Sequence, residues 1–234
     1  MSCPIRAIVF DVYGTLISTG TGSVEAAREI LARNRREAPS PQDFYRRWKA
    51  LHREHMDQLA DTGNFLREED IFLADLEQLY QEYGMGSRAK DDGKIMLKTL
   101  GKRQAFPESR EVLEHLARRF VLAIGSTTDT APLLADLERG GLKVSQVFTS
   151  ESLRCYKPQL KFYQTILREL GVPGQQALFV GDSLTDDVAG PKKAGMKTCW
   201  VNRKGQPSPF GEEAPDFEIS SLKELPEILE GRST

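Results

Sequence analysis

The feature that most constrains the fold is a series of short apolar runs separated by segments with helical periodicity. Each run is rich in β-branched, aromatic or other large apolar residues, and polar residues or glycine bound it, which is typical of strands buried on both faces. Strands that alternate with helices predict an α/β fold with a parallel sheet and right-handed crossovers. The runs are Ala7–Phe10, Val121–Ile124, Gln146–Phe148, Ala177–Val180 and Thr198–Val201.

Residues 23–100 interrupt this alternation. The segment is long and charged, carries apolar residues at three- or four-residue intervals, and contains no convincing strand. We interpret it as a helical insertion after the first strand. The sequence therefore predicts a core made of residues 1–20 and 98–234, with a helical unit at 21–97.

Two segments of the predicted core carry apolar residues at helical spacing. They are Glu108–Phe120 and Phe162–Leu170, and Gly171 ends the second pattern. The inserted unit is expected to move relative to the core, with hinges near Ser18–Gly22 and Gly93–Phe106.

Charge and cysteine usage exclude several classes of protein. The 234-residue chain has a formal net charge of -2, which disfavours a broad nucleic-acid-binding surface. Its three cysteines, Cys3, Cys155 and Cys199, lie far apart, so neither a disulfide framework nor a zinc site is expected. No apolar stretch approaches the ~20 residues of a membrane helix, and the first residues lack a signal-peptide pattern. We expect a cytoplasmic protein without nucleic-acid or membrane partners, and a homodimer is an open alternative to a monomer.

The first strand ends in a candidate nucleophile. Ligands bind beyond the carboxyl ends of the strands in an open parallel sheet, so polar residues at these ends are candidate site residues. Asp11 follows the first strand, and a carboxylate there can attack phosphorus or carbon to form an ester that water then opens. Gly14 allows a sharp turn, and the Thr15 hydroxyl can hold the carboxylate. The alternative is that Asp11 only caps this turn.

Two further strand ends carry polar residues that suit an anionic ligand. Ser126 and Thr127 can bind an oxyanion through hydroxyl and backbone N–H groups, although both residue types are also ordinary helix caps. Lys157, which precedes Pro158, can neutralise the nucleophile and an anionic substrate, although most lysines are simply solvated.

The fourth strand end is acidic. Asp182, Asp186 and Asp187 lie within six residues after a buried strand, and their mutual repulsion is costly without a cation. A Mg²⁺ ion held by one or two of these carboxylates, water and substrate oxygen would relieve it. The alternative is a capping cluster at a helix start, where negative charge is favourable.

Together, these four motifs resemble those of the haloacid dehalogenase superfamily of hydrolases. The resemblance covers residues 5–20 and 105–203, and the insertion lies where that superfamily carries a helical cap. It implies a Rossmann-like doubly wound parallel sheet with an inserted helical cap, Asp11 as the nucleophile, and Mg²⁺ as the cofactor. The residues that it implies are Asp11, Tyr13, Thr15, Ser126 and Lys157 for catalysis, Gly125, Thr127 and Lys49 for a small anionic substrate, and Asp11, the Tyr13 carbonyl and Asp182 with Asp186 or Asp187 for the metal.

The chain departs from both main branches of this superfamily. Tyr13 stands where phosphatases usually carry an acid/base Asp, and a tyrosine with a pKa of about 10 is a poor base at neutral pH. The form Asp-x-Tyr-Gly-Thr-Leu looks like the haloacid dehalogenases. Those enzymes, however, carry an arginine where Lys49 follows Trp48, and they lack the acidic Asp182. We favour a Mg²⁺-dependent phosphatase, with a cofactor-free 2-haloacid dehalogenase and a binding protein without turnover as alternatives.

Three aromatic side chains outside the motifs are further candidate site residues. His52 and His55 have the spacing of one helix face, but no carboxylate motif completes a metal site, so we interpret both as solvated histidines. Tyr163 lies six residues beyond Lys157, where dehalogenases place an active-site tyrosine, and core packing explains an aromatic residue there equally well.

Overall fold

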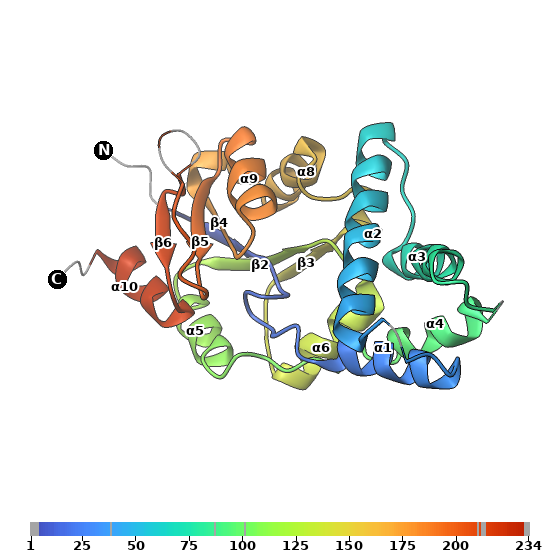
Figure 1. The fold of residues 1–234 in the computed structure, drawn as a ribbon. Coiled ribbons are helices and arrows are strands. Elements are labelled where there is room, and N and C mark those ends of the chain that lie inside the picture. Colours follow the sequence, from blue (N-terminus) through green and yellow to red (C-terminus); the bar gives the residue numbers. More distant parts are fainter. Residues whose placement is uncertain are drawn as a thin grey trace.

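The sheet at the centre of the molecule has six parallel strands in the order β3-β2-β1-β4-β5-β6 (Figure 1). The computed structural model describes residues 5–37, 39–86, 88–100, 102–209, 211 and 214–231. This strand order is that of a Rossmann-like doubly wound sheet, which confirms the predicted fold class. The strands are β1 (Ala7–Phe10), β2 (Val121–Ser126), β3 (Gln146–Thr149), β4 (Ala177–Gly181), β5 (Lys197–Val201) and β6 (Phe217–Ile219).

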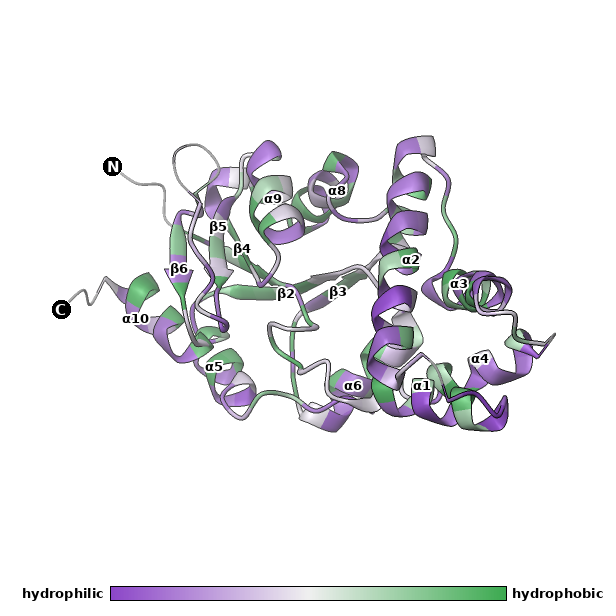
Figure 2. Cartoon of the chain, viewed as in Figure 1, coloured by the Kyte–Doolittle hydropathy of each residue, from purple (hydrophilic) through white to green (hydrophobic). Residues whose placement is uncertain are grey.

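Helices cover both faces of the sheet, as expected for strands that are apolar throughout. On one face, Ile8, Phe10 and their neighbours pack against α5 (Ser109–Leu116), α6 (Thr130–Gly140) and α10 (Leu225–Glu230). On the other face, the strands pack against α8 (Leu160–Leu170), which lies beside α9 (Gly190–Lys193). Figure 2 shows hydrophobic colour concentrated on the strands and hydrophilic colour on the outer sides of the helices.

The inserted segment forms a separate group of helices beside the sheet. Its described residues hold α1 (Gly22–Arg33), α2 (Pro41–Thr62), α3 (Glu68–Glu82) and α4 (Ala89–Leu97), and no strand. These helices have a hydrophobic cluster of their own, which includes Ile30, Phe44, Trp48 and Leu79. We refer to α1–α4 as the cap. The exact division of the chain into a core and a cap stays a prediction.

Several shorter elements complete the core. They are α7 (Ser150–Leu153), the 3-10 turns η1 (Gly174–Gln176) and η4 (Leu222–Glu224), and a π-helical turn, η2 (Leu184–Ala189), which directly follows the acidic end of β4. No helix in the described part of the chain combines the length and hydrophobicity that a membrane crossing requires.

Some sequence predictions need correction. The strand β6 was not expected, and α5 ends at Leu116 rather than at Phe120. Gly93 lies inside α4, so the second connection between cap and core begins only after Leu97. Cys3 and Gly101 lie outside the described residues, and Cys155 and Cys199 are buried free thiols.

Candidate active site

Asp11 lies at the centre of the sheet edge because β1 is flanked by β2 and β4. Its backbone N–H donates to the Val180 carbonyl at 2.9 Å, which continues the strand pairing and fixes the position of the side chain. The Thr15 hydroxyl donates to Asp11 Oδ2 at 3.1 Å. The turn between them requires Gly14, whose φ is +99° and whose missing Cβ would lie 2.4 Å from Asp182 Oδ2. The carboxylate of Asp11 is therefore held rigidly at the mouth of a strand.

Lys157 joins two buried carboxylates. Its Nζ lies 2.8 Å from Asp11 Oδ1 and 2.7 Å from Asp187 Oδ1, and the lysine side chain is only 3% exposed. Burial opposes the charge on Lys157, but the Asp11 and Asp187 carboxylates raise its pKa well above the usual value. Burial also raises the pKa of Asp187, to about 7. The Lys157 backbone N–H donates to Thr127 Oγ1 at 3.3 Å, which links the second and third motifs.

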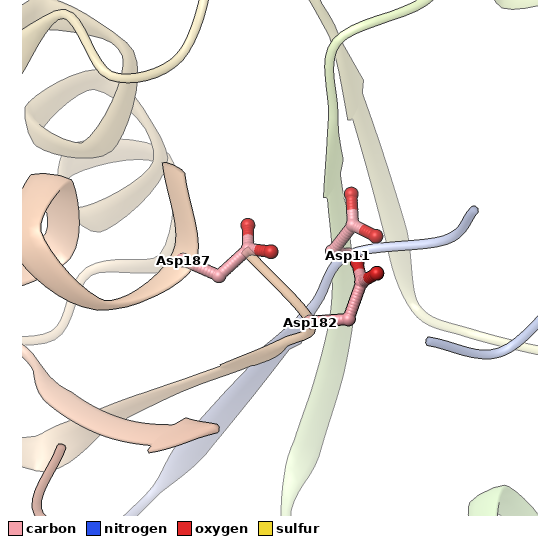
Figure 3. A group of neighbouring side chains, drawn as sticks. All are labelled: Asp11, Asp182 and Asp187. Carbon is pink, nitrogen blue, oxygen red and sulfur yellow. The ribbon is translucent and has the colours of Figure 1, made fainter. Parts of the chain in front are cut away.

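Three carboxylates converge at the ends of β1 and β4 (Figure 3). One oxygen each of Asp11, Asp182 and Asp187 lies within 4.8 Å of the others. Although part of the Asp182 side chain reaches solvent, desolvation and the Asp11 charge raise its pKa to about 6. Lys157 supplies a single positive charge against three carboxylates. Carboxylate oxygens at this spacing fit a divalent cation, and Mg²⁺ is bound in proteins by such ligands together with water and substrate oxygen.

Asp186 is not a member of this carboxylate group among the described residues. Its Oδ2 lies 3.2 Å from Nη1 of Arg53 on α2, and its backbone carbonyl accepts a hydrogen bond from the Tyr163 hydroxyl at 2.5 Å. Of the two alternatives in the acidic motif, the structure places Asp187 rather than Asp186 next to Asp11 and Asp182. Tyr163 is fully buried and supports this loop from α8.

The hydroxyl of Tyr13 is committed to a structural bond. It donates to Asp136 Oδ2 at 2.9 Å, and Asp136 is fully buried in α6. The guanidinium of Arg103 lies over the Tyr13 ring, 4.1 Å from its centroid. Burial raises the pKa of Tyr13 further above its ordinary value, although Arg103 opposes this rise. Tyr13 therefore cannot exchange a proton near neutral pH in place of the usual aspartate.

A cavity of about 300 Å³ lies between the sheet edge and the cap, which suits a small metabolite. Most of the predicted site residues line it: Asp11, Tyr13, Lys49, Ser126, Thr127, Lys157, Asp182, Asp186 and Asp187. Thr15 does not line the cavity but supports Asp11 from behind. Gly125 does not line it either. A Cβ at Gly125 would lie 3.0 Å from Ile166 and Val9, so this glycine serves close packing inside the sheet.

Sequence reasoning missed Arg103. It lines the cavity from the connection between α4 and α5, and within the described residues no carboxylate lies at ion-pair distance from its guanidinium. Arg47, in contrast, pairs on the cap surface with Glu82 at 2.7 Å and with Glu54 at 3.1 Å. The sequence did offer one signal for Arg103: it is a basic residue within the predicted hinge Gly93–Phe106. A connection between the cap and the core passes the mouth of the cavity, so a basic side chain there can reach an anionic ligand.

His52 and His55 are not simply solvated, as predicted, but partly buried. Both rings bond one fully buried carboxylate, that of Asp75 on α3, through Nδ1: His52 to Oδ2 at 2.9 Å and His55 to Oδ1 at 2.5 Å. His52 also lines the cavity and stacks on Phe72 at a centroid distance of 4.3 Å. The sequence offered no signal for this arrangement, because Asp75 lies on another helix more than a dozen residues away.

Comparison with known proteins agrees with this geometry. The family model for haloacid dehalogenase-like hydrolases matches residues 5–195. The chain belongs to this family. This haloacid dehalogenase-like hydrolase is 26% identical over 234 residues to an (S)-2-haloacid dehalogenase 4A from Burkholderia cepacia, a match that covers 96% of this chain and 95% of the relative. It is also 30% identical over 233 residues to the phosphatase MT3486 from Mycobacterium tuberculosis. That match covers 97% of this chain and 98% of the relative.

Solved structures share the fold of this haloacid dehalogenase-like hydrolase. The HAD-hydrolase YfnB from Bacillus subtilis, in a form bound to magnesium, superposes with a TM-score of 0.82 at 22% sequence identity, covering 97% of this chain and 100% of that chain. At this identity the likeness shows the fold alone. The chain is therefore a hydrolase of this family, and the relatives include both dehalogenases and phosphatases.

Proposed function

We propose that this hydrolase is a Mg²⁺-dependent phosphatase of a small anionic metabolite. The observation that carries the proposal is the convergence of Asp11, Asp182 and Asp187 within 4.8 Å around a single lysine. A cofactor-free displacement of halide has no need of the third carboxylate, and Asp182 beside the nucleophile would repel the carboxylate of a haloacid. A divalent cation bound between the three carboxylates would offset their mutual repulsion.

The cavity is suited to a phosphate ester. Ser126 and Thr127 follow β2 and can donate to non-bridging phosphate oxygens, while Lys49 and Arg103 bring positive charge from the cap and from the connection beyond it. Neither Lys49 nor Arg103 has an ion-pair partner in the described part of the chain. Their charges are therefore available to an anionic substrate.

The reaction follows from the position of Asp11. Its carboxylate attacks phosphorus, the bond from phosphorus to the alcohol oxygen breaks, and the alkoxide oxygen takes a proton from a general acid as it leaves. Water then opens the aspartyl phosphate, which releases inorganic phosphate and restores the carboxylate. Thr15 and Lys157 fix the orientation of Asp11, and Lys157 offsets charge on the reacting oxygens. A bound Mg²⁺, held by Asp11, Asp182 and Asp187 with the Tyr13 carbonyl, would neutralise charge on the transferring group.

Hydrolysis of a 2-haloacid is the second candidate. It is supported by the similarity along nearly the whole chain to the Burkholderia cepacia dehalogenase and by Tyr13, since halide displacement from carbon requires no leaving-group proton. In that reaction Asp11 would displace halide, and Lys49 or Arg103 would hold the substrate carboxylate. The Lys157–Asp187 pair would then lie beside the ester that water opens.

One set of assays separates these functions. Purified protein is incubated with an aryl phosphate or with 2-chloropropionate, each with Mg²⁺ or with a chelator, and Asp11→Asn serves as the control. Phosphate release that requires Mg²⁺ and is lost in Asp11→Asn supports the phosphatase. Halide release that is insensitive to the chelator would replace it with the dehalogenase. If neither product forms while Mg²⁺ still raises the melting temperature, a binding protein without turnover is favoured.

A further inference from the structure

We propose that His52 is the general acid and base of this hydrolase, with Asp75 as its positioning residue. The inference rests on the proposed phosphatase function and identifies the group that exchanges protons with the leaving alcohol and with water. The need for such a group follows from Tyr13, whose hydroxyl is bonded to Asp136 and cannot serve. His52 is a cap residue, so the reaction would be completed by a side chain that the core does not supply.

The geometry of His52 is that of an oriented catalytic imidazole. Its Nδ1 faces Asp75 Oδ2 at 2.9 Å, and stacking on Phe72 fixes the plane of the ring. With Nδ1 donating to the carboxylate, Nε2 is the nitrogen that can exchange a proton. His52 lines the same cavity as Asp11, so this nitrogen is the one available to a substrate bound there.

Two carboxylates, those of Asp75 and Glu68, lie close to the ring nitrogens. Asp75 is fully buried, and a buried carboxylate is costly unless a cation or several hydrogen bonds satisfy it. Among the described residues, the side chains that form hydrogen bonds with its two oxygens are those of His52 and His55. Glu68, at the start of α3, has its Oε1 3.9 Å from His52 Nε2. Lys49 from α2 and Arg103 bring positive charge to the same cavity.

The proton balance closes without any further reagent. The Nε2 proton of the His52 imidazolium passes to the departing alkoxide oxygen as the bond to phosphorus breaks. The neutral ring then accepts a proton from the water that attacks the aspartyl phosphate, and the imidazolium is restored. Asp75 keeps its negative charge throughout and holds the ring in one tautomer.

His55 provides a matched control within the chain. It bonds the same carboxylate as His52, but it lines a different surface depression, together with Leu59 and Leu66, and does not line the cavity. Asparagine at either position removes the ionisable ring but keeps an amide N–H near the place of Nδ1, which can still donate to Asp75. His52→Asn and His55→Asn thus perturb Asp75 alike, and only the first removes a group from the cavity.

The experiment compares these variants on aryl phosphates whose leaving groups differ in basicity. For phenyl phosphate with Mg²⁺, we expect His52→Asn to lower kcat by ~100-fold or more, since a general acid contributes about 10²–10⁴-fold. For p-nitrophenyl phosphate, whose leaving group needs no proton, the loss in the first chemical step is expected to be much smaller. The limb of the kcat/KM pH profile that reports the acid should disappear in His52→Asn and persist in His55→Asn.

The outcomes distinguish this role from the proposed function. If the wild-type protein releases phosphate but His52→Asn keeps the wild-type leaving-group dependence and pH profile, the role of His52 is refuted and the phosphatase stands. If both variants lose activity equally with equal losses in melting temperature, Asp75 and its histidines are structural only, which also refutes it. If the wild-type protein releases no phosphate from either ester, the proposed function fails, and this role fails with it.

Discussion

At the scale of single residues, Lys157 holds the site together. Its ammonium group is the shared partner of Asp11 and Asp187, and all three side chains are buried. We expect Lys157→Met to abolish activity and to lower the free energy of unfolding by about 3–5 kcal/mol near neutral pH, because two buried carboxylates lose their cation. Urea unfolding measures this loss. Burial raises the pKa of Asp187 to about 7 although Lys157 lowers it, so the pKa of this carboxyl should rise further in Lys157→Met. The loss should therefore shrink as the pH falls, because protonation of Asp187 removes the uncompensated charge.

Lys49→Met is the control for this prediction. Lys49 lines the same cavity but is exposed, and it forms no ion pair with a described residue. Its replacement should change the free energy of unfolding by less than about 0.5 kcal/mol. Equal losses in the two variants would show that Lys157 does not stabilise the carboxylates.

Asp182 gives the site a metal-dependent stability. Its pKa in the folded protein is about 6, above the ordinary value, so the folded state binds this proton more tightly than the unfolded chain. Stability is therefore lost as the pH rises from about 4 to about 6. Without metal, we expect Asp182→Asn to melt at a higher temperature than the wild type at pH values above this window, and at a similar temperature below it.

Addition of Mg²⁺ should reverse this order. The ion binds the folded wild type and raises its melting temperature, whereas Asp182→Asn lacks a ligand and should show little shift. Thermal melts with Mg²⁺ and with a chelator, at pH values on both sides of 6, measure both effects. An equal Mg²⁺ shift in the two proteins would remove Asp182 from the metal site.

Residues that act through distant partners could not be predicted from the sequence. Asp11, Ser126, Lys157 and Asp182 were found because each directly follows an apolar strand or lies in a short motif, and parallel strands bring their ends together. The bond between His52 and Asp75 joins two cap helices whose relative rotation depends on tertiary packing. No local pattern encodes that rotation.

At the scale of elements, the start of α3 is capped by a residue of the core. Asp129 Oδ1 accepts the Glu68 N–H and Oδ2 accepts the Glu69 N–H, both at 2.9 Å, whereas the residue before α3, Arg67, has no capping side-chain bond. We expect Asp129→Ala to cost about 1–2 kcal/mol of stability through the lost cap. It should also raise KM, because Glu68 lines the cavity.

Ser40→Ala is the matched control for Asp129→Ala. Ser40 caps α2 by accepting the Asp43 N–H at 3.1 Å, and this bond lies wholly within the cap. Its loss should reduce stability by a similar amount and leave KM unchanged. A similar rise of KM in both variants would show that general loosening of the cap, rather than its docking through Asp129, controls substrate binding.

Elements differed in how well the sequence predicted them. The central strands β1 and β4 are apolar at every position and fully buried, so their pattern is unambiguous. The strand β6 has three residues, lies at the edge of the sheet and is only partly buried. Its extended conformation depends on pairing with β5, and its own residues show no clear strand pattern. The π-helical turn η2 likewise depends on its surroundings, since its Asp187 accepts a bond from the distant Lys157 ammonium at 2.7 Å.

At the scale of the whole molecule, the cap and the core are joined by two adjacent connections and by several side-chain contacts. Ile17 bridges to Ala105, and the Ser18 N–H donates to the Gln104 carbonyl at 2.9 Å, so the two connections run side by side. The side-chain contacts join Arg53 to Asp186, the Tyr156 hydroxyl to the Leu66 backbone, and Gln159 to the Ala60 carbonyl. We predict that the cap rotates as a unit about the paired connections.

Ligand binding should therefore protect the connections. Thr19 and Gly20 are exposed and lie in the first connection. Thr19 also lines the cavity, which holds groups from both the cap and the core. A phosphate ion bound with Mg²⁺ would contact both sides and favour the closed arrangement. We expect Mg²⁺ with phosphate to slow limited proteolysis within residues 18–22 several-fold. The Arg53→Gln variant loses the contact with Asp186, so we expect it to be cut faster than the wild type when no ligand is present. Cutting that is insensitive to both changes would show that the cap does not open about these connections.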